Sequence, residues 1–249
     1  MKKILISLVL LCTLFMAGCS QSNNGEVETP DNSLDLEELL PYYSSVTGSD
    51  TTLQSELKVI ISANVKSVSY SDLWEICAEA NEDPNNSNNV ILLYSGLSVH
   101  KTDDKNTGGS TGWNREHVWP QSLGGYKTDA HHVMPDDYKT NNTRGNNPFA
   151  VGGSFASTST GFVTTSKSSG STFEPRDEVK GDVARICMYV AVKYDFDINM
   201  VISESLALQW HAQDPVDAFE QNRNDVIFSH QNNRNPFIDH PQFAYSIWE

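Results

Sequence analysis

An acid and a histidine stand side by side at Glu116 and His117, and an asparagine follows at Asn141. Cutting a phosphodiester bond requires a base for the attacking water, and histidine can fill that role near neutral pH. It also requires neutralisation of the charge that develops on the phosphate and the leaving oxygen, which a hard cation held by oxygen ligands can supply. The carboxylate of Glu116 and the amide oxygen of Asn141 suit Mg²⁺ better than zinc. These three residues therefore predict metal-dependent phosphodiester hydrolysis.

A β-hairpin packed on a helix is expected to position these residues, within about residues 112–146. The first strand should end near His117, and a second strand at 131–134 should return beside it. The segment 135–136 is expected to open a helix that carries the asparagine and ends near Gly145.

The end of the first strand matters because neighbouring residues on a strand point to opposite faces. Glu116 and His117 can share one site only if the strand ends or bends there. The Trp-Pro pair at 119–120 is expected to mark that end.

Three segments around these residues resemble the endonuclease I family. They read Asn-Arg-Glu-His-Val-Trp-Pro at 114–120, Asp-Ala-His-His-Val-Met-Pro at 129–135 and Asn-Asn-Thr-Arg-Gly-Asn at 141–146. Four later segments are similar to further blocks of that family, so the resemblance extends from about residue 60 to the end: 181–185, 209–211, 220–224 and 235–239. The family consists of exported nonspecific nucleases of the His-Me finger (ββα-metal) type.

The resemblance implies a role for each of the three residues. His117 would be the general base, and Glu116 with Asn141 would bind Mg²⁺, for which Mn²⁺ or Ca²⁺ could substitute. The implied products carry 5′-phosphates, and little sequence preference is implied. DNA is the implied substrate and RNA a second one, although the sequence does not rank the two.

Two arginines are candidates for binding the substrate phosphate. The loop at 118–128 is short, whereas some relatives insert a longer segment there that carries a phosphate-binding arginine. Arg144, also a candidate catalytic residue, and Arg185 are the substitutes on chemical grounds, because a guanidinium matches phosphate geometry. Arg144 could instead complement a helix dipole, and Arg185 could be an internal ion-pair partner. Asn114 and Arg115 are further candidate nucleic-acid contacts.

Other assignments stay open at this point. His131 and His132 permit a rival zinc-dependent hydrolase built together with His117, or they orient the hairpin by hydrogen bonds. Asn142 replaces Asn141 as ligand if the helix phase shifts by one residue. A non-catalytic surface lipoprotein that binds a partner is a second rival. Three tryptophans are expected in the core rather than as base-stacking platforms: Trp113, Trp119 and Trp210.

The amino terminus predicts export. Two lysines precede an apolar run at 4–16, and small residues follow before Cys19, which is the pattern of a signal peptide over residues 1–18. The run is too short to span a bilayer. Its end resembles a lipobox, in which Cys19 becomes the lipid anchor, and a secreted protein cut there without lipidation is the alternative. Residues 19–33 then form a polar tether, and residues 34–249 a single nuclease domain.

The cellular setting follows from that reading. We expect an exported protein at the bacterial cell envelope or in the medium, in contact with a membrane only through the lipid anchor, and monomeric. After processing, Cys77 and Cys187 remain, and either a disulfide or two buried free thiols is compatible with export.

Charge is distributed unevenly along a chain whose net charge is −15. The middle stretch, 101–193, holds 11 basic and 10 acidic residues, whereas 19–100 holds 2 and 13 and 194–249 holds 2 and 9. If the middle stretch forms one face of the folded domain, its basic side chains could contact the phosphates of a nucleic acid. An ordinary acidic surface without a basic face is the alternative.

The pattern of apolar residues predicts an α+β fold, mostly helical, around the finger and a small antiparallel sheet. A buried strand is expected at 90–94, and short strands between 152 and 170. Helical spacing recurs in five segments, the last entered through Asp214-Pro215: 50–64, 70–81, 176–194, 206–210 and 216–228.

Overall fold

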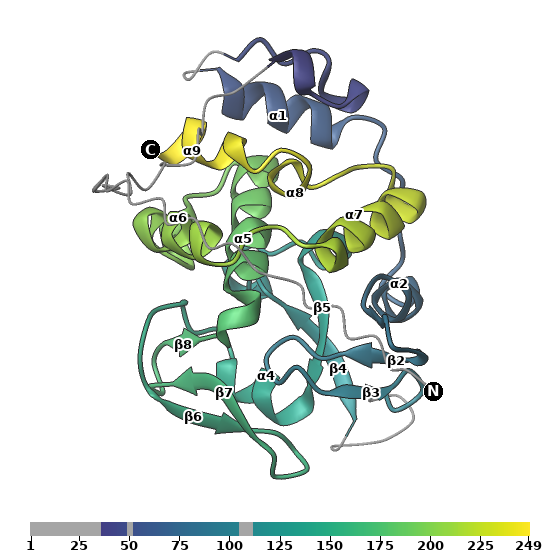
Figure 1. Cartoon of the computed structure of the whole chain (residues 1–249), viewed down its shortest axis with the longest axis vertical. Coiled ribbons are helices and arrows are strands. Elements are labelled where there is room, and N and C mark those ends of the chain that lie inside the picture. The colour runs from purple at the N-terminus through teal and green to yellow at the C-terminus, as the bar shows by residue number, and fades with distance from the viewer. Residues whose placement is uncertain (1–35, 49–51, 105–111) are drawn as a thin grey trace, which may run out of the picture. The chain divides into compact units, whose positions relative to one another are not determined.

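The computed structural model describes residues 36–48, 52–104 and 112–249 (Figure 1). These residues all belong to one unit, residues 32–249. The predicted signal peptide, Cys19 and the tether lie outside the described residues. Within the described ranges, no helix is long and apolar enough to cross a membrane.

The fold is α+β, as predicted, and helices supply most of its core. The α-helices are α1 Leu53–Ser62, α2 Asp72–Ala80, α4 Tyr138–Arg144, α5 Lys180–Tyr194, α6 Glu204–Gln213, α7 Ala218–Gln231, α8 Pro236–Asp239 and α9 Gln242–Trp248. Short 3-10 helices are η1 Leu36–Glu38, η2 Pro41–Tyr43, η3 Gln121–Leu123, η4 Ala130–His132, η5 Asp177–Val179 and η6 Ile198–Met200.

Helix α5 lies at the centre of the unit, with α1, α6 and α8 packed against it (Figure 1). Its residues from Val183 to Val192 are all buried. A helix that is apolar on most sides is stable only when its neighbours cover it, and the surrounding helices do so here. The described fold therefore has an α-helical core, and the site elements lie at its lower end in Figure 1.

Among the described residues, three small antiparallel sheets accompany the helices. Their strands are β1 Glu82–Asp83, β2 Asn86–Ile91 and β3 Ser98–His100; β4 Trp113–His117 and β5 Val133–Asp137; and β6 Ser154–Ser157, β7 Val163–Ser168 and β8 Phe173–Glu174. The β4–β5 pair has a regular register, from Trp113 opposite Asp137 to His117 opposite Val133. Helix α4 packs against both of its strands.

Helix α4 has a defined start and end. The Asp137 side chain caps its first turn by accepting hydrogen bonds from the backbone N–H groups of Lys139 and Thr140. Gly145 follows the last helical residue with a φ of 56°, a conformation that glycine adopts without strain. The predicted end of this helix near Gly145 is confirmed.

Two boundaries in the hairpin were predicted wrongly. The returning strand occupies Val133–Asp137 instead of 131–134, because Asp129 accepts a hydrogen bond from the His131 N–H and caps the 3-10 turn η4. The helix begins at Tyr138 instead of 135–136, because Pro135 lies within the strand opposite Arg115. Proline is tolerated in such a position on a two-stranded sheet, where an unpaired edge is present.

Two further boundaries also differ from the prediction. The apolar run 90–94 is buried, but strand β2 starts earlier and ends at Ile91. Helix α7 starts at Ala218 with Asp217 as its cap. Asp214, the predicted cap, instead accepts a hydrogen bond from the Gly181 N–H at 2.8 Å. The remaining four helical segments and the short strands between 152 and 170 are confirmed.

Two cysteines and three tryptophans of the described residues lie in the interior. Cys77 and Cys187 are free and buried, and burial raises the pKa of each thiol to about 12. Of the two alternatives left open by the sequence, the structure therefore shows two buried free thiols and not a disulfide. The three tryptophans that we expected in the core are buried: Trp113, Trp119 and Trp210.

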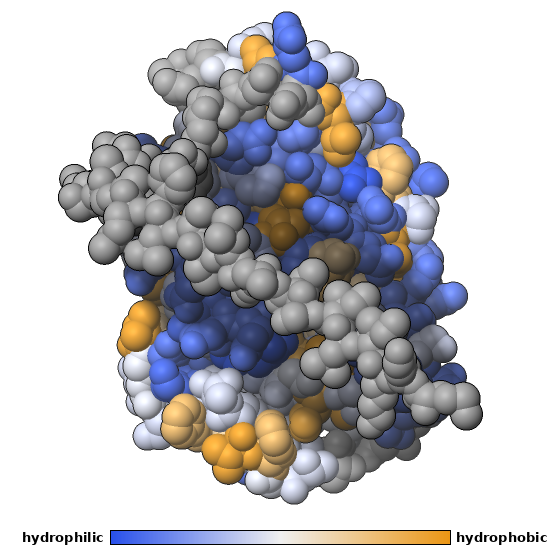
Figure 2. Space-filling model, in the orientation of Figure 1, coloured by the Kyte–Doolittle hydropathy of each residue, from blue (hydrophilic) through white to orange (hydrophobic). Residues whose placement is uncertain are grey.

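The visible surface is largely hydrophilic, with an apolar patch over β6 and β7 (Figure 2). Phe155 on β6 is 62% exposed, and Phe162 and Val163 are 47% and 60% exposed.

Candidate active site

Strand β4 and helix α4 bring the two predicted metal ligands to one face. Asn114 and Glu116 are two apart on the strand and so point the same way, while Asn141 and Arg144 are three apart on the helix and share a face. Nδ2 of Asn141 donates a hydrogen bond to Oδ1 of Asn114 at 2.6 Å. Nη1 of Arg144 lies 3.3 Å from Oε1 of Glu116. The helix and the strand therefore contact each other through two side-chain pairs, Asn141 with Asn114 and Arg144 with Glu116.

Glu116 is a buried carboxylate, with 2% of its surface exposed. The hydroxyl of Tyr94 donates to its Oε1 at 2.8 Å, and Arg144 forms the buried ion pair. Burial raises the pKa of Glu116, and the charge of Arg144 and the Tyr94 hydrogen bond partly offset this effect. Both partners favour the ionised form, which is the form that binds a cation.

His117 ends β4 and turns to the opposite side. Its Nε2 lies 3.1 Å from the carbonyl oxygen of Lys127. Because a carbonyl can only accept, the proton is on Nε2, and Nδ1 carries the lone pair. The side-chain amide of Gln121 donates to Nδ1 at 3.3 Å. Burial, followed by the neighbouring ring of His132, lowers the pKa of His117 to about 4.

Cationic side chains surround an aromatic ring next to this histidine. The ring of Tyr70 is stacked beside that of His117, with centroids 6.2 Å apart. The guanidinium of Arg115 lies 3.6 Å from the Tyr70 centroid, and the ammonium of Lys127 lies 4.3 Å from it. Arg115 also donates to the Tyr70 carbonyl. The predicted contact residue Arg115 thus lies in a cation–π cluster beside the candidate base.

The two predicted phosphate-binding arginines are buried. Arg144 is 1% exposed, and besides its ion pair it donates to the carbonyls of His117 and Val118, which fixes the end of β4. Arg185 is fully buried and paired with Glu220, so the internal ion-pair alternative describes its position. A phosphate-binding role for either arginine stays a prediction, and neither presents its guanidinium to solvent here.

The neighbouring histidines donate to separate carbonyls. His131 Nε2 lies 2.9 Å from the Asn233 carbonyl and His132 Nε2 lies 2.6 Å from the Tyr126 carbonyl. In the part of the chain that the structure describes, no three His, Cys, Asp or Glu side chains are grouped to hold a metal. The hydrogen-bonding role of His131 and His132 fits these contacts, and the zinc alternative does not.

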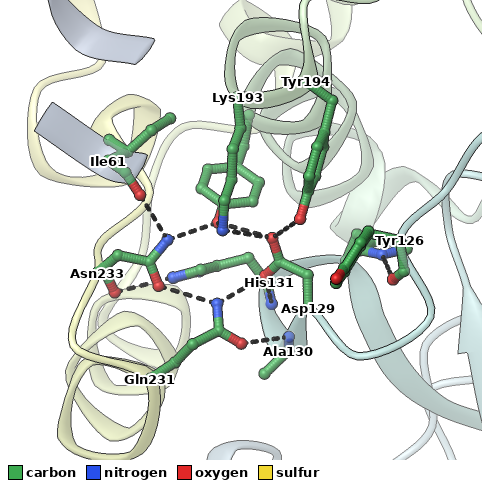
Figure 3. A network of polar contacts seen from close by, with 11 residues as sticks. Ile61, Tyr126, Asp129, Ala130, His131, Lys193, Tyr194, Gln231 and Asn233 are labelled. Atoms are coloured by element: carbon green, nitrogen blue, oxygen red, sulfur yellow. Dashed lines mark hydrogen bonds and ion pairs between the residues drawn. The ribbon is translucent and has the colours of Figure 1, made fainter. Parts of the chain in front are cut away.

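Asp129 organises the turn that carries these histidines (Figure 3). Its carboxylate accepts hydrogen bonds from Lys193 and the Tyr194 hydroxyl, both at 2.8 Å, and from the Tyr189 hydroxyl at 2.9 Å. Gln231 donates to the other carboxylate oxygen at 2.8 Å. Burial raises the pKa of Asp129, but the charge of Lys193 and the neighbouring histidines outweigh it and hold the pKa well below its usual range. A buried anion fixed from α5 and α7 thereby anchors the loop beside the candidate base.

Glu116 and Asn141 fit a hard divalent cation by their chemistry. They offer one charged and one neutral oxygen ligand, and Mg²⁺ is commonly held by one or two carboxylates with water and phosphate in the other positions. Asn114 binds the nitrogen of the Asn141 amide, which orients the amide oxygen. Asn142 is exposed, so the helix phase favours Asn141 over its neighbour.

Several site residues escaped the sequence analysis. Tyr94 was assigned only to a buried strand. Its hydroxyl contacts Glu116, 22 residues later, and its N–H donates to Asp136, 42 residues later. Gln121 and Lys127 lie in the short loop, and Tyr70 precedes α2. A polar tip at the end of an apolar run could have marked Tyr94, whereas the other three become site residues only through folding.

A buried acid, an imidazole with its lone pair on Nδ1 and an oriented amide lie on one hairpin and helix, an arrangement that fits the chemistry of a nuclease. The family model for endonuclease I matches residues 49–242, and the chain belongs to the endonuclease I family. It is 44% identical over 232 residues to the extracellular ribonuclease of Bacillus amyloliquefaciens, covering 83% of this chain and 78% of that protein. It is 42% identical over 232 residues to the extracellular ribonuclease of Bacillus subtilis (strain 168), with the same coverage of 83% and 78%.

Proposed function

We propose that the protein is an exported, metal-dependent endonuclease that hydrolyses RNA and DNA with little sequence preference and leaves 5′-phosphate ends. The observation that carries the proposal is the orientation of His117. Lys127 holds the proton on Nε2, so the lone pair is on Nδ1, where an attacking water would replace the Gln121 amide as the donor. The relatives named extracellular ribonucleases support RNA as a substrate and support export.

The proposed reaction takes place at the end of β4, where His117 is the last residue of the strand and Glu116 precedes it, so that a phosphate at the strand end would reach both. His117 takes the proton of the attacking water at Nδ1. Glu116 and Asn141 would hold Mg²⁺, which when bound supplies Lewis-acid stabilisation of the phosphate and the leaving oxygen. Tyr94 and Arg144 favour the ionised form of Glu116 and hold the side chain in place. Arg115 and Lys127 put positive charge beside the base, where a phosphate would approach.

Attachment to the cell surface is a separate part of the proposal. We infer from the sequence that Cys19 carries a lipid anchor and that the enzyme acts at the envelope. Labelling with a fatty-acid analogue in wild type and Cys19→Ala tests it: the label should be lost and the protein released in the variant. Labelling that persists without Cys19 contradicts the anchor and leaves the enzymatic proposal untouched.

The enzymatic proposal is tested with the purified protein, RNA and supercoiled plasmid. Both substrates should be degraded in Mg²⁺ and left intact in EDTA. Excess Mg²⁺ should restore the chelated enzyme, whereas stoichiometric Zn²⁺ should not. His117→Ala should abolish degradation of both substrates. A folded wild-type protein that leaves RNA and plasmid intact in Mg²⁺, Mn²⁺ and Ca²⁺ would overturn the proposal.

A further inference from the structure

A cavity of about 360 Å³ lies next to the candidate base. Its lining includes Lys66, Tyr126, Asp129, Lys193 and Tyr194. Its volume falls within the range of about 300–1,000 Å³ that is usual for small-ligand pockets. None of these residues takes part in the chemistry described above, so the cavity needs its own explanation.

One backbone segment separates this cavity from His117. The side chains of Tyr126 and Thr128 line the cavity, while the carbonyl of Lys127 between them accepts the His117 hydrogen bond at 3.1 Å. The Tyr126 carbonyl accepts from His132 at 2.6 Å. A ligand in the cavity would therefore lie one loop thickness from the base.

The cavity has an exposed aromatic platform. Tyr126 is 58% exposed, and its ring is stacked on that of Tyr194 with centroids 5.6 Å apart and planes at 17°. Tyr194 is held in turn by its hydrogen bond to Asp129 and by stacking on Phe196 at 5.9 Å. Such a supported, flat and accessible ring can stack a nucleobase of any type.

The charges at the cavity suit a nucleotide. At its floor, Lys193 and Asp129 form an ion pair at 2.8 Å and neutralise each other (Figure 3). Lys66 lines the cavity and is exposed, and Lys127 is exposed on the adjoining loop. On a chain of net charge −15, two exposed lysines beside an aromatic ring form a local site for a phosphate and a base.

We propose that this cavity is a subsite for the base of an unpaired nucleotide flanking the scissile phosphate, with the base stacked on Tyr126 and the backbone phosphates beside Lys66 and Lys127. The inference rests on the proposed function and predicts that strands with unpaired bases, such as single-stranded RNA, are cleaved faster than duplexes. A base within a duplex is stacked and paired, and reaching the platform would require its extrusion.

Cleavage of a single-stranded oligoribonucleotide series tests the subsite. Each member carries one abasic residue at a different position, and the rate at one chosen bond is measured by gel electrophoresis in Mg²⁺. In the wild-type protein, the abasic residue should slow that bond by about tenfold at one flanking position, because stacking on the platform is lost. At more distant positions the rate should stay within about twofold.

Tyr126→Ala should remove this position dependence, and Tyr126→Trp should keep it, because tryptophan preserves a platform. Phe155→Ala is the matched control, since it removes a different exposed ring, on β6, and should leave the position dependence unchanged.

If wild type cleaves the intact oligonucleotide but shows no position at which an abasic residue slows cleavage, the subsite is overturned while the nuclease stays in place. Sensitivity that survives unchanged in folded Tyr126→Ala overturns it as well. No cleavage of any oligonucleotide by wild type overturns the proposed function, and the subsite with it.

Discussion

The carbonyl oxygen of Lys127 lies 3.1 Å from Nε2 of His117, ten residues earlier in the chain. The loop between them, residues 118–126, folds back so that its own backbone sets the tautomer of the histidine at the strand end. Most histidine bases depend on a partner that holds the second ring nitrogen, and here the partner is a main-chain group that no side-chain substitution removes.

His117→Ala should therefore lower kcat for RNA by about 10²–10⁴-fold, the usual contribution of a general base. The midpoint of thermal unfolding should change little, because the ring makes one hydrogen bond to the protein backbone. Added imidazole should restore part of the activity of the variant, and kinetic assays with and without imidazole measure this rescue.

His100→Ala is the control, since His100 is exposed on β3 and its removal should not change kcat. Activity of His117→Ala within about threefold of wild type would contradict the assignment of the base.

Asn141→Ala should raise the Mg²⁺ concentration for half-maximal activity by about 10–100-fold. The variant loses the oriented amide that Asn114 holds at 2.6 Å. Asn142→Ala is the matched control on the same helix turn, and its Mg²⁺ dependence should equal that of wild type because its side chain is exposed. Titrations of activity against Mg²⁺ for the three proteins decide the matter, and a shift confined to Asn142→Ala would reassign the ligand.

Arg144→Met should destabilise the fold by about 3–5 kcal/mol, because it leaves the buried Glu116 carboxylate without its cationic partner and three carbonyl contacts unmade. Urea denaturation measures this free energy of unfolding. Lys139→Met removes an exposed cation from the same helix and should cost less than about 1 kcal/mol. Equal stability of the two variants would mean that the buried ion pair contributes nothing.

The hairpin and the helix that carry the three predicted site residues were predictable because their signals are local. Alternation fixes which face Glu116 and His117 occupy, and the Asn141 helix ends at a glycine. The error in the returning strand was local too. The sequence interpretation missed that Asp129 caps a 3-10 turn. Because this turn occupies Ala130–His132, the strand and the helix after it both begin later than predicted.

The surroundings of the site were not predictable, because they depend on contacts between distant segments. Asp129 binds Lys193 from 64 residues away and Gln231 from 102 residues away. The charge pattern misled for the same reason. Arg144 and Arg185 contribute to the basic stretch 101–193, but folding buries both in ion pairs. Periodicity along the chain shows which residues are buried, and it does not show which charges neutralise each other.

His211 should make the fold sensitive to acid. Its Nε2 donates to the Pro241 carbonyl, and Arg185 donates to its Nδ1 at 3.4 Å. Burial, followed by the charge of Arg185, lowers its pKa to about 4 from an unfolded value of about 6.5. Between those pH values His211 is protonated in the unfolded chain and neutral in the folded chain. The free energy of unfolding therefore falls as pH falls. From the difference of the two pKa values, the loss of unfolding free energy attributable to His211 is about 3 kcal/mol between pH 7 and pH 4.

Urea denaturation of wild type and His211→Gln across this range measures the effect. The plots of unfolding free energy against pH for the two proteins should converge toward low pH, because the variant lacks the titrating ring. Parallel curves would show that His211 takes up its proton equally in both states.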